Sequence, residues 1–265
     1  MVEINKDYNI PTMDKDEYIP EFKKMVDAVH KNGANIIAQI SIIKEFDLSL
    51  EELHRIPILF AEAAERCKKA GFDGIEIGAN HHGLLSQYLS PMFNHRTDEY
   101  GGSDENRARI IVEIIEKIRK NVGNDFIISV KINVIDGVEN GINEQGLLTA
   151  CKLIEKAGAD FIQTSGNYAE YKIKPKSPIF YEEGKKIAEV VNIPVVLIGG
   201  IRDMETMEDI LKESNIQYFG IGRPLVCEPD LVKRWENGER CKSKCIGCNG
   251  CAKNLAHTCV INKNK

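Results

Sequence analysis

The chain has 265 residues, of which 43% are hydrophobic, so it can bury a substantial core as one large globular domain. Its formal charge of −5 and pI near 5.8, with Lys and Arg interspersed among Asp and Glu, favour a small-molecule substrate over a nucleic-acid partner. No apolar run approaches the roughly 18 residues that a membrane span requires, so we expect no membrane partner.

The N-terminal sequence MVEINKDYN lacks the apolar stretch of a signal peptide. We therefore expect a cytoplasmic protein, whose eight cysteines are reduced or bound to metal rather than paired in disulfides. Five of the eight lie between Cys241 and Cys259, a concentration that core packing does not explain. The C-terminal segment is therefore expected to have a chemistry of its own.

Amphipathic helical stretches alternate with short apolar strands along the chain, which is typical of parallel α/β architecture. The first unit has apolar residues at helical spacing from Ile19 to Val29, a stop at Gly33 and the β-rich segment IIAQIS at 36–41. Further helices are expected through 60–71 and 106–122. Six strands are expected, beginning at Ile36, Gly74, Ile127, Phe161, Val195 and Tyr218.

A faint internal repeat relates KKAGFDGIEIG at 68–78 to EKAGADFIQTSG at 155–166, and repeated αβ units predict a TIM-type (β/α) barrel. A doubly wound sheet is the alternative, but it usually has a Gly-rich turn after its first strand, and none follows 36–41. Since a complete barrel of this type has eight βα units, six strands predict an incomplete one. We expect the barrel to span 1–240 and a short Cys-rich tail to span 241–265.

The segment LLSQYLSPMFNHRTDEYGGSDENRAR, from Leu84 to Arg109, is the most specific part of the sequence. Its charged residues are suited to ion pairing and Ser103 to capping a helix that begins near Asp104, so most of it is interpreted as scaffold. The same segment resembles the signature of the Old Yellow Enzyme-like NADH:flavin oxidoreductases. With AGFDGIEI before it and GIGRPLV after it, the resemblance covers the chain from about Asp14 to Asp230.

This resemblance implies a barrel that holds FMN at the C-terminal ends of its strands. Hydride would pass from NAD(P)H to the flavin and then to an unsaturated organic acceptor. Gln39 matches a glutamine that forms a hydrogen bond with the flavin ring, and Lys131 matches a basic position beside that ring. Without the resemblance, Lys131 would be interpreted as an ordinary lysine at the end of a strand. The phosphate is expected at Gly199, Gly200, Gly222 and Arg223. The alternative interpretation of the glycines is that they end the strands for steric reasons.

The substrate end departs from the family pattern. Gly78 stands where the first substrate-binding histidine is expected, and Gly83 replaces a tyrosine that often donates a proton. Neither glycine has a side-chain proton to donate. His81 retains the second histidine position and is a candidate catalytic residue. His82 could compensate through a shift of the loop, or could be an exposed loop residue with no role.

The C-terminal tail contains four thiols with metal-ligand spacing. Cys245, Cys248 and Cys251 form a C-x₂-C-x₂-C motif, and Cys259 follows. The order after GIGRPLV resembles the iron-sulfur branch of the family, similar to 2,4-dienoyl-CoA reductase and trimethylamine dehydrogenase, which implies a [4Fe-4S] cluster. The second and last gaps are shorter here than in that branch, and a Cys₄ zinc site is the alternative.

Cys241 is a spare ligand candidate in the tail. Cys67 and Cys151 lie on expected helices beside Ala and Leu, so they are interpreted as core residues.

The favoured function is therefore an FMN-dependent, NAD(P)H-using oxidoreductase. The absent βα units would leave two strand edges exposed, and a homo-oligomer or a partner chain could complete the barrel. The alternatives are a truncated, non-catalytic member of the family and a metal-dependent interaction module.

Overall fold

The computed structural model describes residues 13–42, 46–166, 178–253 and 258–262. It contains one parallel sheet, in which each strand pairs with the next in the sequence. The strands are β1 (Ile37–Ile40), β2 (Gly74–Ala79), β3 (Ile127–Asn133), β4 (Phe161–Ser165), β5 (Val195–Ile198) and β6 (Tyr218–Gly220). The six expected strands are confirmed, and only the first begins one residue later than expected.

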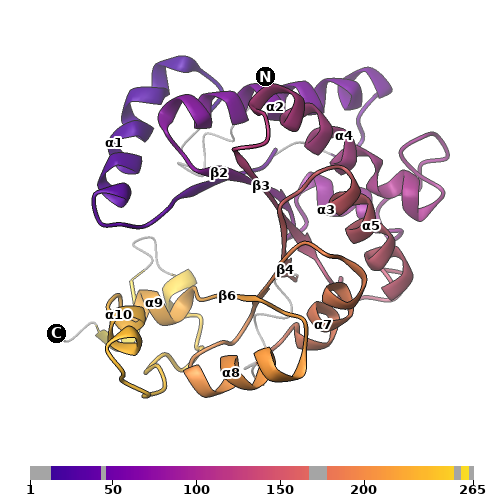
Figure 1. The fold of residues 1–265 in the computed structure, drawn as a ribbon. Coiled ribbons are helices and arrows are strands. Elements are labelled where there is room, and N and C mark those ends of the chain that lie inside the picture. Colours follow the sequence, from indigo (N-terminus) through magenta and orange to yellow (C-terminus); the bar gives the residue numbers. More distant parts are fainter. Residues whose placement is uncertain (1–12, 43–45, 167–177, 254–257, 263–265) are drawn as a thin grey trace.

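The sequential strand order is that of a barrel, since a doubly wound sheet reverses its order at a switch point. Figure 1 shows the strands following an arc with helices on its outer side, and the first unit faces the last elements across the open side. Among the described residues, no strand pairs with the outer edge of β1 or of β6. The predicted incomplete TIM-type barrel is confirmed.

Six longer helices alternate with the strands, and shorter helical turns connect them. The longer helices are α1 (Ile19–His30), α2 (Leu50–Ala70), α4 (Asp104–Val122), α5 (Glu144–Lys156), α7 (Tyr181–Val190) and α8 (Met204–Glu213). The shorter ones are η2 (Asp16–Tyr18), α3 (Leu84–Leu89), α9 (Arg223–Cys227), α10 (Leu231–Glu236), η3 (Gly250–Lys253) and η4 (Val260–Asn262). None of the described helices is long and apolar enough to cross a membrane.

Polar side chains fix where the helices end and the strands begin. A capping box between Ser49 and Glu52 starts α2, and Gly71 ends it in the left-handed conformation with φ 92°. Asp73 accepts hydrogen bonds from the Ile36 amide at 2.7 Å and from His30 at 2.9 Å, which ties the end of α1 to the entrance of β1. These contacts define both ends of α2 and fix the start of β1 relative to α1.

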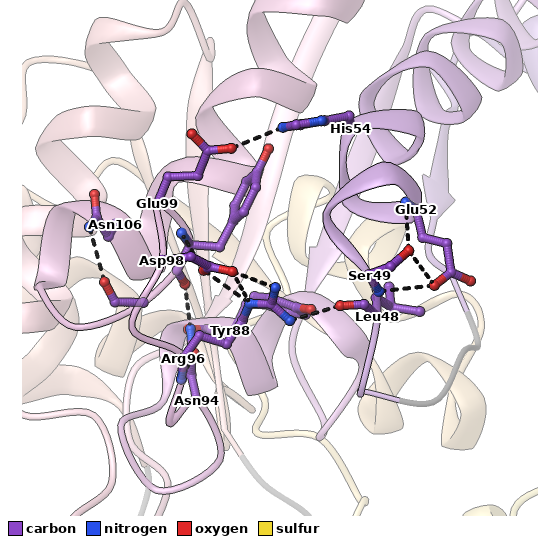
Figure 2. A network of polar contacts seen from close by, with 12 residues as sticks. Leu48, Ser49, Glu52, His54, Tyr88, Asn94, Arg96, Asp98, Glu99 and Asn106 are labelled. Carbon is purple, nitrogen blue, oxygen red and sulfur yellow. Dashed lines mark hydrogen bonds and ion pairs between the residues drawn. The ribbon is translucent and has the colours of Figure 1, made fainter.

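The segment after β2 is a polar scaffold, as expected (Figure 2). Arg96 forms an ion pair with Asp98 and donates to the Leu48 carbonyl at 2.7 Å, which joins this loop to the start of α2. Asn94 donates to the carbonyls of Tyr88 and Tyr100 at 2.7 Å each. The expected Ser103 cap of α4 is present. These contacts therefore fix the loop between β2 and α4, and its residues 84–103 do not line the cavity described below.

The two faces of the sheet differ in burial. The face toward the helices carries Ile75, Ile77, Ile128, Val130 and Leu197, all fully buried. The inner face is partly exposed, and Gln39 on β1 is exposed. The hydrophobic core thus lies between the sheet and its helices, whereas the inner face of the open barrel is available for a ligand.

Candidate functional site

A cavity of about 930 Å³ lies at the C-terminal ends of the later strands. This is within the usual size range of small-molecule sites, roughly 300–1,000 Å³. Strand ends contribute His81, Lys131 and Gln163, and the loop after β5 and the turn after β6 contribute further residues. The tail also lines the cavity, with Cys245, Ile246, Gly247, Asn249, Ala252 and Lys253.

The lining is cationic although the chain as a whole is acidic. Lys131, Arg202, Arg223 and Lys253 line the cavity, and the lining contains no Asp or Glu among the described residues. Positive groups facing a cleft with walls of low dielectric raise the local concentration of anions. The cavity is therefore suited to a ligand with a phosphate or carboxylate group.

The expected phosphate end lies at this cavity. Gly199 and Gly200 have φ values of 101° and 95°, a left-handed conformation that favours glycine over other residues. A methyl group added at Gly222 would have no atom within 4 Å, so this backbone faces open space. Arg223 follows directly. All four residues predicted for phosphate binding lie in the lining.

The tail folds back over the phosphate end. Arg223 donates to the Asn249 side-chain carbonyl, and Arg202 donates to the Cys245 carbonyl at 3.2 Å. The Ser243 amide donates to the Arg202 carbonyl at 2.8 Å. The segment predicted as a separate Cys-rich unit thus forms one wall of the cavity.

A buried carboxylate holds the tail in this position. Glu228 accepts hydrogen bonds from the Ser243 hydroxyl at 2.8 Å, the Lys244 amide at 2.6 Å and Arg234 at 2.6 Å. Burial acts to raise the pKa of Glu228, but these hydrogen bonds and the Arg234 charge outweigh it and hold that pKa below its usual range. Trp235 adds a hydrogen bond to the Cys241 carbonyl at 2.9 Å.

Lys131 lies in the middle of the inner face. In the strand register it is flanked by Gly78 on β2 and by Gln163 on β4. Glu76, one layer deeper, is buried beside it, and the Ser129 hydroxyl lies 3.5 Å from its carboxylate. Burial raises the pKa of Glu76, and the Lys131 charge and Ser129 oppose this shift only in part. Lys131 thus lies between the cavity and a buried acidic group.

His81 reaches the cavity from a strained turn. Its φ is 53°, and its amide donates to the Asn133 side-chain carbonyl at 3.1 Å. Burial lowers the pKa of His81, the Lys131 charge lowers it further, and a hydrogen bond to the Gly166 carbonyl opposes the shift. The imidazole is therefore mainly neutral at neutral pH.

Two of the residues predicted for catalysis or flavin binding lie outside the cavity lining. His82 is exposed, and its ring packs edge-on against Phe93 with the ring centres 5.6 Å apart. Gln39 is exposed on β1, and a methyl group added at Gly78 would lie 3.1 Å from its side-chain nitrogen. The Gln39 amide thus occupies part of the space that a larger side chain at Gly78 would need.

The tail cysteines differ in exposure. Cys245, Cys251 and Cys259 are half-buried, and Cys248 is exposed. Among the side chains that the structure describes, no three His, Cys, Asp or Glu residues are arranged to hold a single metal ion. Cys241 accepts from Arg234 at 3.4 Å.

Burial raises the pKa of both Cys67 and Cys151 to about 12, which fits the core role expected for them.

A further cysteine was not singled out from the sequence. Cys227 ends α9 and is 3% exposed. Burial, followed by the contact with Cys259, raises the pKa of Cys227 to about 11. The other residues that sequence reasoning missed are Glu76, Gln163, Arg202, Asn249 and Lys253.

Of the missed residues, Arg202 had the clearest signal, since it follows the predicted Gly199–Gly200 turn at a strand end. Gln163 alternates with buried residues on β4, which places it on the inner face. The contribution of Asn249 and Lys253 depends on how the tail folds back, for which the sequence has no local signal.

Comparison with known proteins agrees with this geometry. The NADH:flavin oxidoreductase / NADH oxidase family model matches residues 42–241. An NADH oxidase of Thermoanaerobacter brockii is 32% identical over 290 residues, covering 94% of this chain and 44% of the relative. A cinnamate reductase of Clostridium sporogenes is 28% identical over 307 residues, covering 95% of this chain and 46% of the relative. The chain thus spans less than half the length of these two relatives.

The fold agrees as well. An old yellow enzyme homologue from Zymomonas mobilis superposes with a TM-score of 0.73 at 24% identity, covering 88% of this chain and 75% of that structure. The family match extends from just after β1 to the first residue of the tail, and it includes the scaffold after β2 and the glycine turns of the cavity. The chain belongs to the Old Yellow Enzyme-like NADH:flavin oxidoreductase / NADH oxidase family.

Proposed function

We propose that this chain forms the flavin-binding part of an NAD(P)H-dependent oxidoreductase that reduces an unsaturated organic acceptor. The observation that carries the proposal is the cavity at the strand ends, which is lined by four cationic side chains and by no described Asp or Glu. The cinnamate reductase among the relatives supports an electron-poor alkene as the acceptor class.

The residues of the cavity fit FMN. Arg202 and Arg223, with the backbone at Gly199, Gly200 and Gly222, would hold its phosphate, since guanidinium groups and exposed amides bind phosphate well. Lys131 would stabilise the negative charge that reduction places on the ring. When bound, FMN supplies a ring that accepts hydride from NAD(P)H and delivers it to the acceptor.

His81 is the residue we assign to the acceptor. Its neutral ring can donate a hydrogen bond to a carbonyl oxygen conjugated with the double bond, and Lys131 next to it disfavours the imidazolium form. Gly78 and Gly83 have no side-chain donors, so the proton that completes reduction would come from His81 or from water. His82 would take part only after a shift of its loop.

We also propose that the tail cysteines hold a [4Fe-4S] cluster, which would exchange single electrons with the flavin. The support is the spacing of the four tail thiols, because thiolate ligands suit iron-sulfur chemistry, and Cys245 among them lines the cavity. A Cys₄ zinc site at the same thiols is the alternative, since tetrahedral thiolate sites suit both metals. Among the described side chains, no three His, Cys, Asp or Glu residues are arranged to hold one metal ion, so metal analysis decides between these proposals.

The protein would also pair with further polypeptide at the outer edges of β1 and β6. These edges have no partner strand among the described residues, and exposed edges of parallel sheets are normally covered. A second copy or a partner chain could supply the missing βα units. Analytical ultracentrifugation of the purified protein, with mass spectrometry of any companion chain, tests this part of the proposal.

A second candidate is a non-catalytic member of the family that keeps the scaffold. The observation that favours it is the loss of both donors at Gly78 and Gly83, together with the Gln39 amide beside Gly78. Such a protein could bind FMN without reducing an alkene.

Anaerobic purification followed by flavin, iron and sulfide analysis and an NADH oxidation assay distinguishes the two candidates. The favoured proposal expects stoichiometric FMN and NADH oxidation that depends on an α,β-unsaturated ketone or carboxylate. His81→Gln should slow this reaction while FMN stays bound. Bound FMN without alkene-dependent turnover would support the non-catalytic candidate. Absence of FMN even after reconstitution would overturn the favoured proposal and leave a non-catalytic scaffold.

A further inference from the structure

The tail segment 245–250 lies beside one of the two arginines proposed to hold the FMN phosphate. The Arg223 guanidinium donates a hydrogen bond to the Asn249 side-chain carbonyl, and both residues are half-buried and line the cavity. A methyl group added at Gly247 would lie 4.0 Å from the same guanidinium nitrogen. Two residues of this segment are therefore next to the charged end of Arg223.

Contacts at both ends hold the segment in place. At its start, Arg202 donates to the Cys245 carbonyl at 3.2 Å. At its end, a methyl group added at Gly250 would lie 2.7 Å from the Val260 side chain, so the chain packs closely there. The position of Asn249 thus depends on more than its bond to the arginine.

The backbone of Asn249 is unusual for a residue other than glycine. Its φ of 59° lies in the left-handed region, which asparagine and aspartate enter more readily than most residues because their short polar side chains can hydrogen-bond locally. Glycine would also fit this backbone, but it has no side-chain carbonyl to accept from Arg223. Asparagine satisfies both the backbone and the arginine.

Asn249 is a neutral partner, and this affects how strongly Arg223 attracts an anion. Arg96, by contrast, forms an ion pair with the Asp98 carboxylate. A carboxylate orients a guanidinium but also cancels much of its charge toward an incoming anion. The Asn249 amide orients Arg223 and leaves its charge in place, and the described part of the lining contains no Asp or Glu.

We infer that Asn249 is a positioning residue of the cofactor site, which orients the Arg223 guanidinium for the flavin phosphate while preserving its charge. The inference rests on the proposed binding of FMN and adds a residue of the tail to it. A guanidinium has five N–H donors, so one bond to Asn249 does not exhaust its capacity for phosphate oxygens. The tail would then raise the affinity for FMN through Arg223 and leave the affinity for a flavin without phosphate unchanged.

The test compares the affinities of the flavin-free chain for FMN and for riboflavin, which lacks the phosphate, by quenching of flavin fluorescence. Asn249→Gly removes the carbonyl and suits the left-handed backbone, so it should reduce the preference for FMN about 3- to 10-fold. Asn249→Asp keeps the shape and the bond to Arg223, but it places a negative charge near the phosphate. It should reduce the preference ~10-fold or more, because closely placed like charges repel strongly.

The aspartate variant separates positioning from a purely structural role. If Asn249 only held the tail in place, Asn249→Asp would form an ion pair with Arg223 and FMN binding would not weaken. The riboflavin affinity and the melting temperature of each variant show whether the rest of the cavity is intact. Asn124→Asp is the matched control, since it adds the same charge in the exposed turn between α4 and β3, at the opposite end of the strands from the cavity. It should bind both flavins like wild type.

A wild-type preference for FMN that Asn249→Asp retains would overturn the inference and leave the proposed function standing. Equal losses of FMN and riboflavin affinity in the Asn249 variants would overturn it as well, because they would indicate damage to the cavity rather than to the phosphate contact. A wild type that binds both flavins equally, or neither, would overturn the phosphate site of the proposed function and the inference with it.

Discussion

Replacing Glu228 with Gln should release the tail from the cavity wall. The carboxylate is 7% exposed and accepts three hydrogen bonds, one of them from the Arg234 guanidinium at 2.6 Å. Gln keeps the shape but loses the charge and turns an NH₂ group toward a donor. A buried hydrogen bond to a charged group contributes about 1.5–3 kcal/mol, and an opposed donor adds a penalty of similar size. We expect the tail to be destabilised by about 3 kcal/mol.

Hydrogen exchange of the Ser243 and Lys244 amides measures this effect directly, because both amides are bonded within the anchor. A loss of about 3 kcal/mol corresponds to exchange that is more than ~100-fold faster in Glu228→Gln. Glu236→Gln, on the exposed side of α10, is the matched control and should exchange like wild type. Exchange in Glu228→Gln within a few-fold of wild type would refute the role of this carboxylate.

The same anchor has a defined pH dependence. Hydrogen bonds hold the pKa of Glu228 below its usual range, so its contribution to stability is present above the unfolded-state pKa and is lost as pH falls through the folded-state pKa. The difference in exchange between wild type and Glu228→Gln should therefore shrink toward acid pH. A difference that grows on acidification would contradict the assignment.

Four further substitutions test the inner face. Lys131→Met should lower the flavin midpoint potential by ~20–45 mV, equivalent to losing about 1–2 kcal/mol of charge stabilisation, and an unchanged potential in anaerobic titration would remove Lys131 from the flavin site. Burial raises the pKa of Glu76, so the contribution of this carboxyl group to stability is present below the unfolded-state pKa and is lost as pH rises through the folded-state pKa. Glu76→Gln should therefore raise the melting temperature at pH ~8 and have little effect near pH ~4. A lower melting temperature of this variant at pH ~8 would contradict the reasoning. Gly74→Ala would place a methyl group 2.5 Å from backbone and side-chain atoms of β3, so it should lower the free energy of unfolding by about 3 kcal/mol or more. The methyl group of Gly78→Ala would meet the movable Gln39 amide and nearby atoms at 3.1 Å or more. This second variant should lose less than about 1 kcal/mol. Urea unfolding of both glycine variants compares the two costs, and equal losses would refute the packing argument.

Much of the fold could be predicted because its signals are local. Each strand is a short run of β-branched or apolar residues that follows an amphipathic helix, and all six were located to within one residue. The start of α2 was missed, since Pro57 interrupts the helical pattern. The capping box formed by Ser49 and Glu52 is the local signal that marks the true start of this helix.

The site was predictable where it depends on strand ends. Lys131, Gly199, Gly200 and Arg223 line the cavity because parallel strands bring their C-terminal ends to one edge, and positions at those ends can be read from the sequence. His81 reaches the cavity for the same reason. Gln39 has the matching position on β1, but it is an edge residue of an open sheet, and its side chain is exposed.

The tail could not be placed from the sequence. Its position depends on contacts between distant residues, such as Arg202 with Cys245 and Glu228 with Ser243, and neither pair has a periodic or spacing signal.

The central claim is that the cationic cavity binds FMN through its phosphate, and the direct test is to titrate the flavin-free protein with FMN and with riboflavin. If Arg202 and Arg223 hold the phosphate through charged hydrogen bonds of about 1.5–3 kcal/mol each, FMN should bind at least ~100-fold more tightly than riboflavin. Arg223→Ala should remove much of that preference and leave riboflavin binding unchanged. Equal affinity for the two flavins, or no binding of either, would contradict the account.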